Sequence, residues 1–159
     1  MSFTVAPKTS ATAKAGDDTV FGFRGPDVML GGPGTDLLLG GAGRDTLLGG
    51  PENDVIDAGP ARDVALGQAG DDVIFGGWRG DVLSGGSGDD RLLGGRGFDT
   101  LYAGVGADVL IGGRGRDVLF SRAADGAVDT LICGPGRDVA HARPEDRVAR
   151  DCERVIQLP

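Results

Sequence analysis

The stretch GGPGTDLLLGGAGRDTLLGG, residues 31–50, contains the pattern that decides the fold. Aspartate stands at positions 36 and 45, nine residues apart, and each aspartate ends a glycine-rich segment. The same spacing continues without a break through most of the chain. The twelve aspartates of the series are Asp18, Asp27, Asp36, Asp45, Asp54, Asp63, Asp72, Asp81, Asp90, Asp99, Asp108 and Asp117. Self-similarity at a fixed period indicates a fold in which similar units stack on one another.

Each nonapeptide divides into a loop and a short strand. The first six residues are rich in glycine, which permits tight turns, and the last three are strand formers such as Thr-Leu-Leu. Proline, which cannot donate to a sheet, falls within the repeats only in loops, at Pro26, Pro33, Pro51 and Pro60. We therefore predict an all-β solenoid with two repeats per coil. Each coil places one short strand in each of two parallel sheets, with successive coils about 4.8 Å apart.

One residue of each repeat, the eighth, is expected to face the interior. These residues are Val20, Met29, Leu38, Leu47, Ile56, Ala65, Ile74, Leu83, Leu92, Leu101, Leu110 and Leu119. The seventh and ninth residues then face outward, because side chains alternate along a strand. Several of them are large and apolar, so the outer faces are candidate contact surfaces for self-association or for another protein. Ordinary strand propensity explains the same residues equally well.

The repeat GGxGxDxUx, where U is a large aliphatic residue, resembles the hemolysin-type calcium-binding nonapeptide of repeats-in-toxin proteins. The resemblance covers Ala15 to Phe120 continuously and Asp129 to His141 less regularly. It implies a right-handed parallel β-roll whose loops bind Ca²⁺. Members of this family are often attached to proteases, lipases or toxins, and no catalytic domain is evident in this chain.

The loops contain the oxygen ligands that calcium prefers, since Ca²⁺ takes six to eight oxygens at about 2.3–2.6 Å. Loops two repeats apart stack, so the aspartates form two rows, one along each edge, and Asp138 extends the second. The resemblance implies that each ion lies between stacked loops and takes carboxylates from both, which allows at most about ten Ca²⁺ ions. Backbone carbonyls are expected from Gly32, Gly34, Gly41, Gly43, Gly86, Gly88, Gly95, Gly97, Gly104, Gly106, Gly113 and Gly115.

Stacked aspartates also repel one another in the folded chain when no metal is bound. Two unit charges about 4.8 Å apart repel by roughly 0.9 kcal/mol even in water. We therefore expect folding to be coupled to calcium binding. The alternative is that the aspartates serve only as turn residues, although the series then offers no reason why asparagine or serine never replaces them.

Some loops depart from the pattern. The fourth position holds Glu52, Ala61 or Arg79 in place of glycine, and a side chain there is expected to hinder the turn, unless Glu52 adds a ligand. Arginine at the fifth position could pair with a neighbouring aspartate or simply face solvent, and we favour solvent. These arginines are Arg44, Arg62, Arg116 and Arg137.

The period breaks after Phe120, where three extra residues precede the last unit. We expect a flexible leader at 1–14, the β-roll at 15–120, and an irregular last repeat with a cap at 121–159. Cys133 stands where glycine usually opens a loop, and Cys152 follows in the charged tail. A disulfide that ties down the cap is predicted, with two free thiols as the alternative. Such a bond indicates an oxidising compartment.

Composition limits the remaining functions. The net charge of −8 does not favour nucleic acid, and no stretch approaches the roughly 18 apolar residues of a membrane span. There is a single histidine, His141, and no HExxH or GxSxG motif, so an enzyme is not expected. Residues 1–14 lack the apolar core of a secretory signal. We expect an extracellular bacterial protein exported by a leader absent from this chain, and an adhesion or self-assembly module as the alternative function.

Overall fold

The computed structural model describes residues 2–4, 10–121 and 125–158, and the regular secondary structure in these ranges is entirely β-strand. The described residues contain no helix that is long and apolar enough to cross a membrane. The strands are β1 (Ser2–Thr4), β2 (Ser10–Thr12), β3 (Thr19–Phe21), β4 (Val28–Leu30), β5 (Leu37–Leu39), β6 (Thr46–Pro51), β7 (Val55–Gly59), β8 (Val64–Ala69), β9 (Val73–Trp78), β10 (Val82–Ser87), β11 (Arg91–Gly97), β12 (Thr100–Val105), β13 (Val109–Gly115), β14 (Val118–Phe120), β15 (Thr130–Ile132), β16 (Val139–Ala142), β17 (Arg147–Val148) and β18 (Arg154–Gln157).

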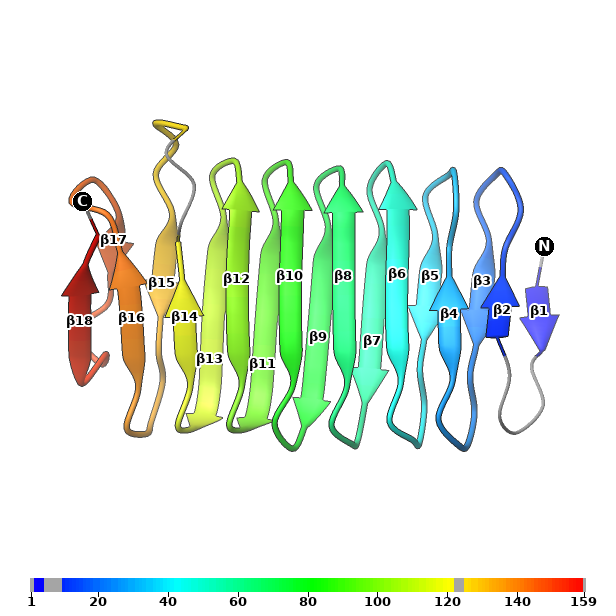
Figure 1. Cartoon of the computed structure of the whole chain (residues 1–159), viewed down its shortest axis with the longest axis horizontal. Coiled ribbons are helices and arrows are strands. Elements are labelled where there is room, and N and C mark those ends of the chain that lie inside the picture. Colours follow the sequence, from blue (N-terminus) through cyan, green and yellow to red (C-terminus); the bar gives the residue numbers. More distant parts are fainter. Residues whose placement is uncertain (1, 5–9, 122–124, 159) are drawn as a thin grey trace.

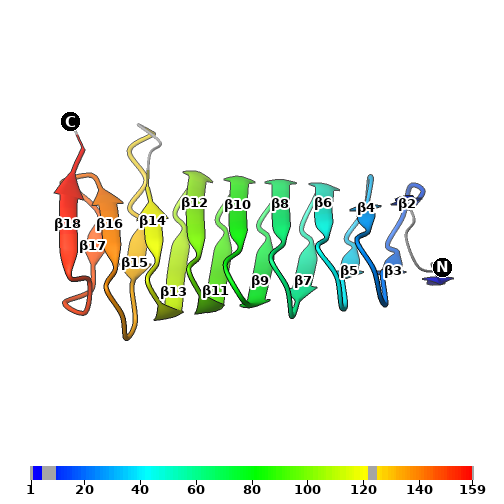
Figure 2. The ribbon, with the colours of Figure 1, turned by 60° about the horizontal axis from the view of Figure 1, so that its bottom comes forward.

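These strands form two parallel sheets that face each other along the whole solenoid (Figures 1 and 2). Odd-numbered strands make one nine-stranded sheet in chain order, and even-numbered strands make the other. Neighbouring strands pair two repeats apart through most of the roll, as in Val20 with Leu38 and Met29 with Leu47. The predicted all-β fold of two parallel sheets with two repeats per coil is therefore confirmed.

The loops between the sheets form two edges. We call the loops that lead from even to odd strands edge 1, and the loops that lead from odd to even strands edge 2. Edge 1 lies at the top of Figure 1 and edge 2 at the bottom. Asp18, Asp36 and their successors lie on edge 1, whereas Asp27, Asp45 and their successors lie on edge 2.

The core is a single column of side chains between the sheets. All twelve residues predicted to face inward have a relative exposure of 0 %. Alanines that follow some of the strands, such as Ala58 and Ala103, are buried beside them. Because each strand pairs directly with the strands one coil away, the backbone of every loop lies close to the loops of the neighbouring coils on the same edge.

The strands differ from the predicted three-residue length in the middle of the roll. β6 to β13 run on into the first loop positions, where Gly50 pairs with Gln68 and Gly95 with Gly113. The sheets also continue past the predicted boundaries of the roll, since β2 pairs with β4 at one end and β16 with β18 at the other. The flexibility predicted for 1–14, part of which lies outside the described residues, and the separate cap at 121–159 stay predictions.

Candidate metal centre

The repeated aspartates are buried although they belong to loops. Thirteen of them, from Asp27 to Asp117 with Asp129 and Asp138, are at most 5 % exposed, and Asp18 is 7 % exposed. Each aspartate precedes a strand, so its side chain turns back under the loop that its own repeat has just formed. An ionised carboxylate without compensation is costly in such a place, and buried charges are normally paired or bound to metal.

One carboxylate oxygen of each aspartate has a clear structural role. From Asp36 onward, Oδ1 accepts a hydrogen bond from the backbone N–H of the aspartate one coil earlier, as in Asp18 N to Asp36 Oδ1 at 2.7 Å and Asp81 N to Asp99 Oδ1 at 2.8 Å. The same bond recurs along both edges up to Asp129 and Asp138, where the insertion lengthens the spacing to 21 residues. The aspartate rows therefore join successive coils through backbone-to-carboxylate bonds.

The second carboxylate oxygen is not satisfied in the same way. Among the described residues, Oδ2 is buried and accepts no hydrogen bond in eleven of these aspartates. They are Asp36, Asp45, Asp54, Asp63, Asp72, Asp81, Asp90, Asp99, Asp108, Asp117 and Asp138. A buried acceptor that receives no hydrogen bond costs about 1–3 kcal/mol, and more when it is charged. A regular row of such oxygens is the clearest indication of a cation site.

Glycine at the first loop position lets this oxygen and a carbonyl of the next coil lie where a side chain would clash. A Cβ atom on Gly94 would lie 2.6 Å from the carbonyl oxygen of Gly112 and 2.7 Å from Asp99 Oδ2. The corresponding distances at Gly76 are 2.7 Å to the Gly94 carbonyl and 2.9 Å to Asp81 Oδ2. Two oxygens lie in the same way beside eight first-position glycines: Oδ2 of the aspartate in the same repeat, and a carbonyl oxygen of the next coil. These are Gly22, Gly31, Gly40, Gly49, Gly67, Gly76, Gly94 and Gly112.

The donor set fits a hard cation. All the groups around these spaces are oxygens, which suit calcium or magnesium better than zinc or copper. Within the described residues, no group of three or more histidine, cysteine, aspartate or glutamate side chains forms a metal site on its own. A cation between the loops would therefore take most of its ligands from the backbone. Carbonyls of predicted residues such as Gly41 and Gly95 do face the next coil, opposite Gly59 and Gly113.

Burial changes the acidity of the ladder. Desolvation raises the pKa of Asp54, Asp81, Asp90, Asp99 and Asp129 to about 7, against an ordinary value of 3.8. Repulsion from stacked carboxylates adds to the rise, and the backbone hydrogen bond to Oδ1 opposes it. The pKa of four further aspartates rises to about 6: Asp45, Asp72, Asp108 and Asp117. A bound cation acts in the opposite direction, because it favours the ionised form.

The irregular loops keep their turns. Glu52 and Arg79 adopt φ values of 74° and 84°, so these side chains do not prevent the conformation that glycine would take. The hindrance predicted for these two positions is thus not seen, although a positive φ costs a residue with a side chain roughly 1–2 kcal/mol. The Glu52 carboxylate accepts a hydrogen bond from Gly34 N at 2.9 Å. Arginine at the fifth position is exposed, as favoured from the sequence.

Alanine at the first loop position is a signal that the sequence reasoning missed. Ala13, Ala58 and Ala103 stand where the other repeats have glycine, and their methyl groups are buried. In these repeats a methyl group stands at the position where glycine elsewhere admits the two oxygens, next to the aspartate of the same repeat. The spaces beside Asp18, Asp63 and Asp108 are therefore the poorest candidates for a cation, and of these loops only that of Asp63, which contains Ala61, also departs from the pattern at the fourth position.

The end of the roll contains three more aspartates that were not predicted as site residues. Asp129 continues the row on edge 1, since its Oδ1 accepts from Asp108 N at 2.9 Å. Asp146 then accepts from Asp129 N at 3.1 Å and from the Ser121 hydroxyl. On edge 2, Asp151 accepts from Gly134 N at 2.9 Å. Their spacing departs from nine, so the period gave no indication of this role.

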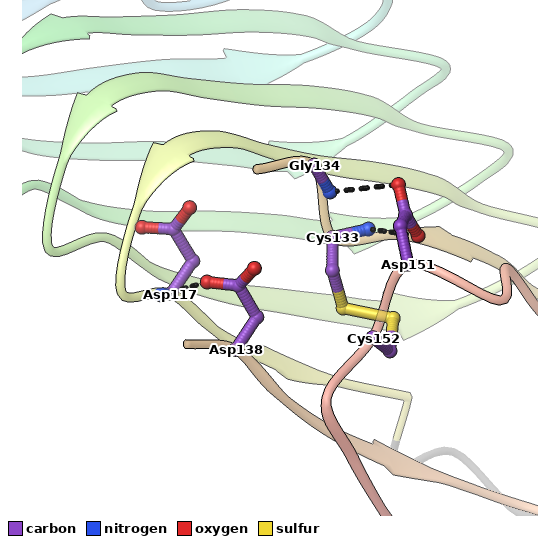
Figure 3. The surroundings of a disulfide bond; sticks show 6 residues. All are labelled: Asp117, Cys133, Gly134, Asp138, Asp151 and Cys152. Atoms are coloured by element: carbon purple, nitrogen blue, oxygen red, sulfur yellow. Dashed lines mark hydrogen bonds between the residues drawn. A yellow bond between two sulfur atoms is a disulfide. The ribbon is translucent and has the colours of Figure 1, made fainter. Parts of the chain in front are cut away.

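The predicted disulfide is present between Cys133 and Cys152. Figure 3 shows it beside the final rung of edge 2, where Asp117 N donates to Asp138 Oδ1 and Asp151 caps the next loop. Cys133 also supplies the carbonyl oxygen that lies 2.7 Å from a Cβ atom placed on Gly112, next to Asp117 Oδ2. The disulfide therefore fixes the backbone that completes the last space of this row.

Comparison with known proteins agrees with this geometry. The family model of the RTX calcium-binding nonapeptide repeat (4 copies) matches residues 12–47, 48–83 and 84–119. Each matched stretch is 36 residues long, or four nonapeptides, and together they cover 108 of the 159 residues. A search of curated proteins found no significant match. On these three consecutive matches, the chain belongs to the family of RTX calcium-binding nonapeptide repeat proteins.

Proposed function

We propose that the chain is a calcium-binding structural module whose folding is coupled to the metal. The observation that carries the proposal is the row of buried Oδ2 oxygens with no hydrogen-bond partner, most of them beside a carbonyl from the next coil. The RTX repeat family supports calcium as the ion. Ladder residues Asp18 to Asp117 at intervals of nine, with Asp138, are the proposed carboxylate ligands, and the loop glycines supply the carbonyls.

The expected number of ions follows from the spaces between loops. Eight first-position glycines have both a carboxylate oxygen and a carbonyl of the following coil beside them. The three alanine positions are expected to bind weakly or not at all. We therefore expect about eight Ca²⁺ ions, below the ceiling of ten that the rows of aspartates alone allow.

Coupling to folding follows from the same residues. Without metal, the ladder aspartates must either remain protonated or bear stacked charges inside the loops, and burial raises their pKa toward 7. The core opposes this with only one buried side chain per repeat. Calcium supplies the compensating charge and fills ligand positions that only the coiled chain brings together, so binding free energy becomes folding free energy.

An extracellular location is part of the proposal. RTX repeat proteins are generally secreted, and the disulfide between Cys133 and Cys152 is the kind of bond that persists in oxidising surroundings. Calcium sites of extracellular modules typically have dissociation constants of about 10⁻⁴–10⁻³ M. Such sites are filled at millimolar calcium and emptied in the cytosol, so the roll would form after export. We propose a structural role, which is typical of RTX β-solenoids, and no catalytic activity.

Far-ultraviolet circular dichroism of the purified chain tests the proposal. With excess chelator at pH 7.5, the spectrum should be that of a largely unfolded chain, and millimolar Ca²⁺ should restore the β-sheet signal. Magnesium at the same concentration is the control, and it should be less effective because its small octahedral shell tolerates few carbonyl ligands. A fully formed β-sheet spectrum in excess chelator would show that the ladder does not need the metal.

A further inference from the structure

Exposed charge is separated between the two edges of the roll. The outer loop positions of edge 2 present eight exposed arginines: Arg24, Arg44, Arg62, Arg79, Arg96, Arg114, Arg116 and Arg137. Edge 1 presents exposed acidic residues instead, at Asp17, Glu52, Asp71, Asp89 and Asp125. In the edge 2 loops between β3 and β16, all of which the structure describes, no exposed acidic side chain accompanies the arginines. The net charge of −8 therefore conceals an edge whose exposed loop charges are positive.

The acidic side chains of edge 1 have a structural role that the arginines of edge 2 lack. Each acidic side chain of edge 1 accepts a hydrogen bond from a backbone N–H of a neighbouring coil, as Asp71 does from Asp89 N at 2.8 Å. Among the described residues, none of the eight arginines of edge 2 has a carboxylate within ion-pair distance. The charge of Arg62 lowers the pKa of Asp81, but none of the eight is held in an ion pair, so they are available to an acidic ligand.

Two large aromatic rings lie among these arginines. Trp78 is 61 % exposed and Phe98 is 66 % exposed, on loops one coil apart. The guanidinium carbon of Arg96 lies 5.8 Å from the centre of the Trp78 ring, and that of Arg116 lies 5.4 Å from the Phe98 ring. Each pair offers a flat apolar surface beside a charged group that can bind an acidic group through two parallel hydrogen bonds.

An open hollow joins the two features. It has a volume of about 580 Å³ and is bordered by Arg44, Arg62 and Arg79, with Phe98 as one wall. Volumes of this size are typical of sites for small ligands. Three guanidinium groups and one ring around a single hollow suit one ring-shaped unit that bears an acidic group. Further arginines on both sides suit the neighbouring units of a chain.

We propose that edge 2 binds an acidic polysaccharide, a linear chain of sugar rings that bear carboxylate or sulfate groups. The edge offers arginines on coils spaced at about 4.8 Å, which matches a ligand whose acidic groups repeat at short intervals. The apolar faces of sugar rings pack on aromatic rings such as Trp78 and Phe98. Nucleic acid is less favoured, because the acidic edge 1 and the net charge oppose a densely charged strand.

Calcium should strengthen this binding, a step that rests on the proposed function. Seven buried ladder aspartates lie beneath the eight arginines of edge 2: Asp27, Asp45, Asp63, Asp81, Asp99, Asp117 and Asp138. Cations held in the same loops would offset their charge and leave the arginines to dominate. By linkage, the polysaccharide should then raise the affinity for calcium by the same factor. The midpoint of the calcium titration should shift to lower concentration when the polysaccharide is present.

Binding can be measured by fluorescence anisotropy with labelled hyaluronate oligosaccharides, which have carboxylates, and labelled dextran sulfate oligosaccharides, which have sulfates. Both are titrated with the full chain in millimolar Ca²⁺, with neutral dextran and single-stranded DNA as comparison probes. We expect binding to one or both acidic probes that weakens as salt is raised, and none to neutral dextran. The stronger of the two acidic probes identifies the acidic group. Tighter binding to the DNA would overturn the assignment to a polysaccharide.

Paired variants locate the surface. Arg44→Gln with Arg62→Gln should weaken binding about tenfold, since each exposed ion pair contributes up to roughly fivefold. Arg91→Gln with Arg147→Gln removes the same charge from exposed positions on β11 and β17 and should have little effect. Phe98→Ala should weaken binding without changing its salt dependence. Equal losses in the two double variants would refute the site on edge 2.

Circular dichroism in calcium separates this proposal from the function on which it rests. If the wild-type chain folds on addition of Ca²⁺ but binds neither acidic probe, only the polysaccharide site is refuted. If the chain shows no response to calcium, the proposed function fails first, whatever the probes show. Salt-sensitive self-association of the chain without any probe, seen by analytical ultracentrifugation, would instead show that edge 2 binds edge 1 of a second copy of the chain.

Discussion

Replacing Asp99 by asparagine should alter stability in opposite directions with and without calcium. Asp99 Oδ1 accepts a hydrogen bond from Asp81 N at 2.8 Å, and asparagine keeps this acceptor. Asp99 Oδ2 is buried without a hydrogen-bond partner and lies near the carbonyl of Gly112. The substitution therefore removes one negative charge from the ladder and introduces a donor where an oxygen was unsatisfied.

The size of the effect without metal follows from the stacking. Asp81 and Asp117 lie one coil away on either side, and both raise the pKa of Asp99 by repulsion. At a coil spacing of about 4.8 Å, each repulsion is roughly 0.9 kcal/mol at the dielectric of water. At pH 8, where the ladder is largely ionised, the variant should stabilise the metal-free roll by about 2 kcal/mol. With calcium, loss of the charged ligand should weaken binding at the adjacent space at least about tenfold.

The two effects can be measured by circular dichroism. In chelator, the osmolyte trimethylamine N-oxide can be used to drive folding, and the variant should need less of it than the wild type. In calcium, the midpoint of the metal titration should move to higher concentration. Asp57→Asn is the matched control, because Asp57 is exposed on β7 and lies outside the ladder. A shift of the same sign in both conditions would refute the reasoning.

Three further predictions concern the loop glycines, acidity and the cap. Gly94→Ala should lower the calcium stoichiometry by about one without preventing folding, since the chain already has Ala103 at the equivalent position. Ala103→Gly should raise the stoichiometry. Calorimetry that found the same stoichiometry in both variants as in the wild type would contradict this prediction. The ladder pKa values are raised in the folded chain, so metal-free stability should be greatest below about pH 4 and should be lost as pH rises through 6–7. A metal-free β-sheet signal that grows between pH 4 and pH 8 would exclude this account. Reduction of the disulfide between Cys133 and Cys152 should cost about 3 kcal/mol by the loop-entropy model, measured as a lower midpoint in urea with calcium present; an unchanged midpoint would show that the cap is stable without it.

The fold could be predicted from the sequence because the nine-residue period identifies the loops, the strands and the core residues together. Glycine and proline mark the loops, the eighth residue marks the core, and the spacing of two repeats fixes which loops stack. The extension of β6 to β13 into the loops could not be predicted in this way. These loop residues pair because their coils are held in register by the aspartate bonds, and glycine has no strand propensity that would have indicated it.

The candidate site was only partly predictable. The period identified the aspartates, but it could not show that Oδ1 and Oδ2 have different environments, because that depends on how the next coil packs. The carbonyls at the first loop position, such as those of Gly94 and Gly112, were missed for the same reason. The closing residues Asp146 and Asp151 lie outside the period, and only their contacts with Asp129 N and Gly134 N reveal them.

The separation of charge between the two edges was visible in the sequence, but the net charge of the whole chain hid it. Arginine occurs in every second repeat at the outer loop positions, and the net charge of −8 averages it with acidic residues on the opposite edge. Once alternate loops are assigned to opposite edges, the net charge no longer excludes every anionic partner at edge 2. It still disfavours a strand as densely charged as nucleic acid.

Calorimetric titration of the chelator-treated chain with Ca²⁺ at pH 7.5 tests most directly whether the buried aspartate oxygens are ligands. The account predicts uptake of about eight ions at submillimolar to millimolar calcium. Few protons should be released, because the aspartates of the unfolded chain are already ionised at this pH. No uptake of calcium at millimolar concentration, or a roll already complete before the first addition, would contradict the central claim.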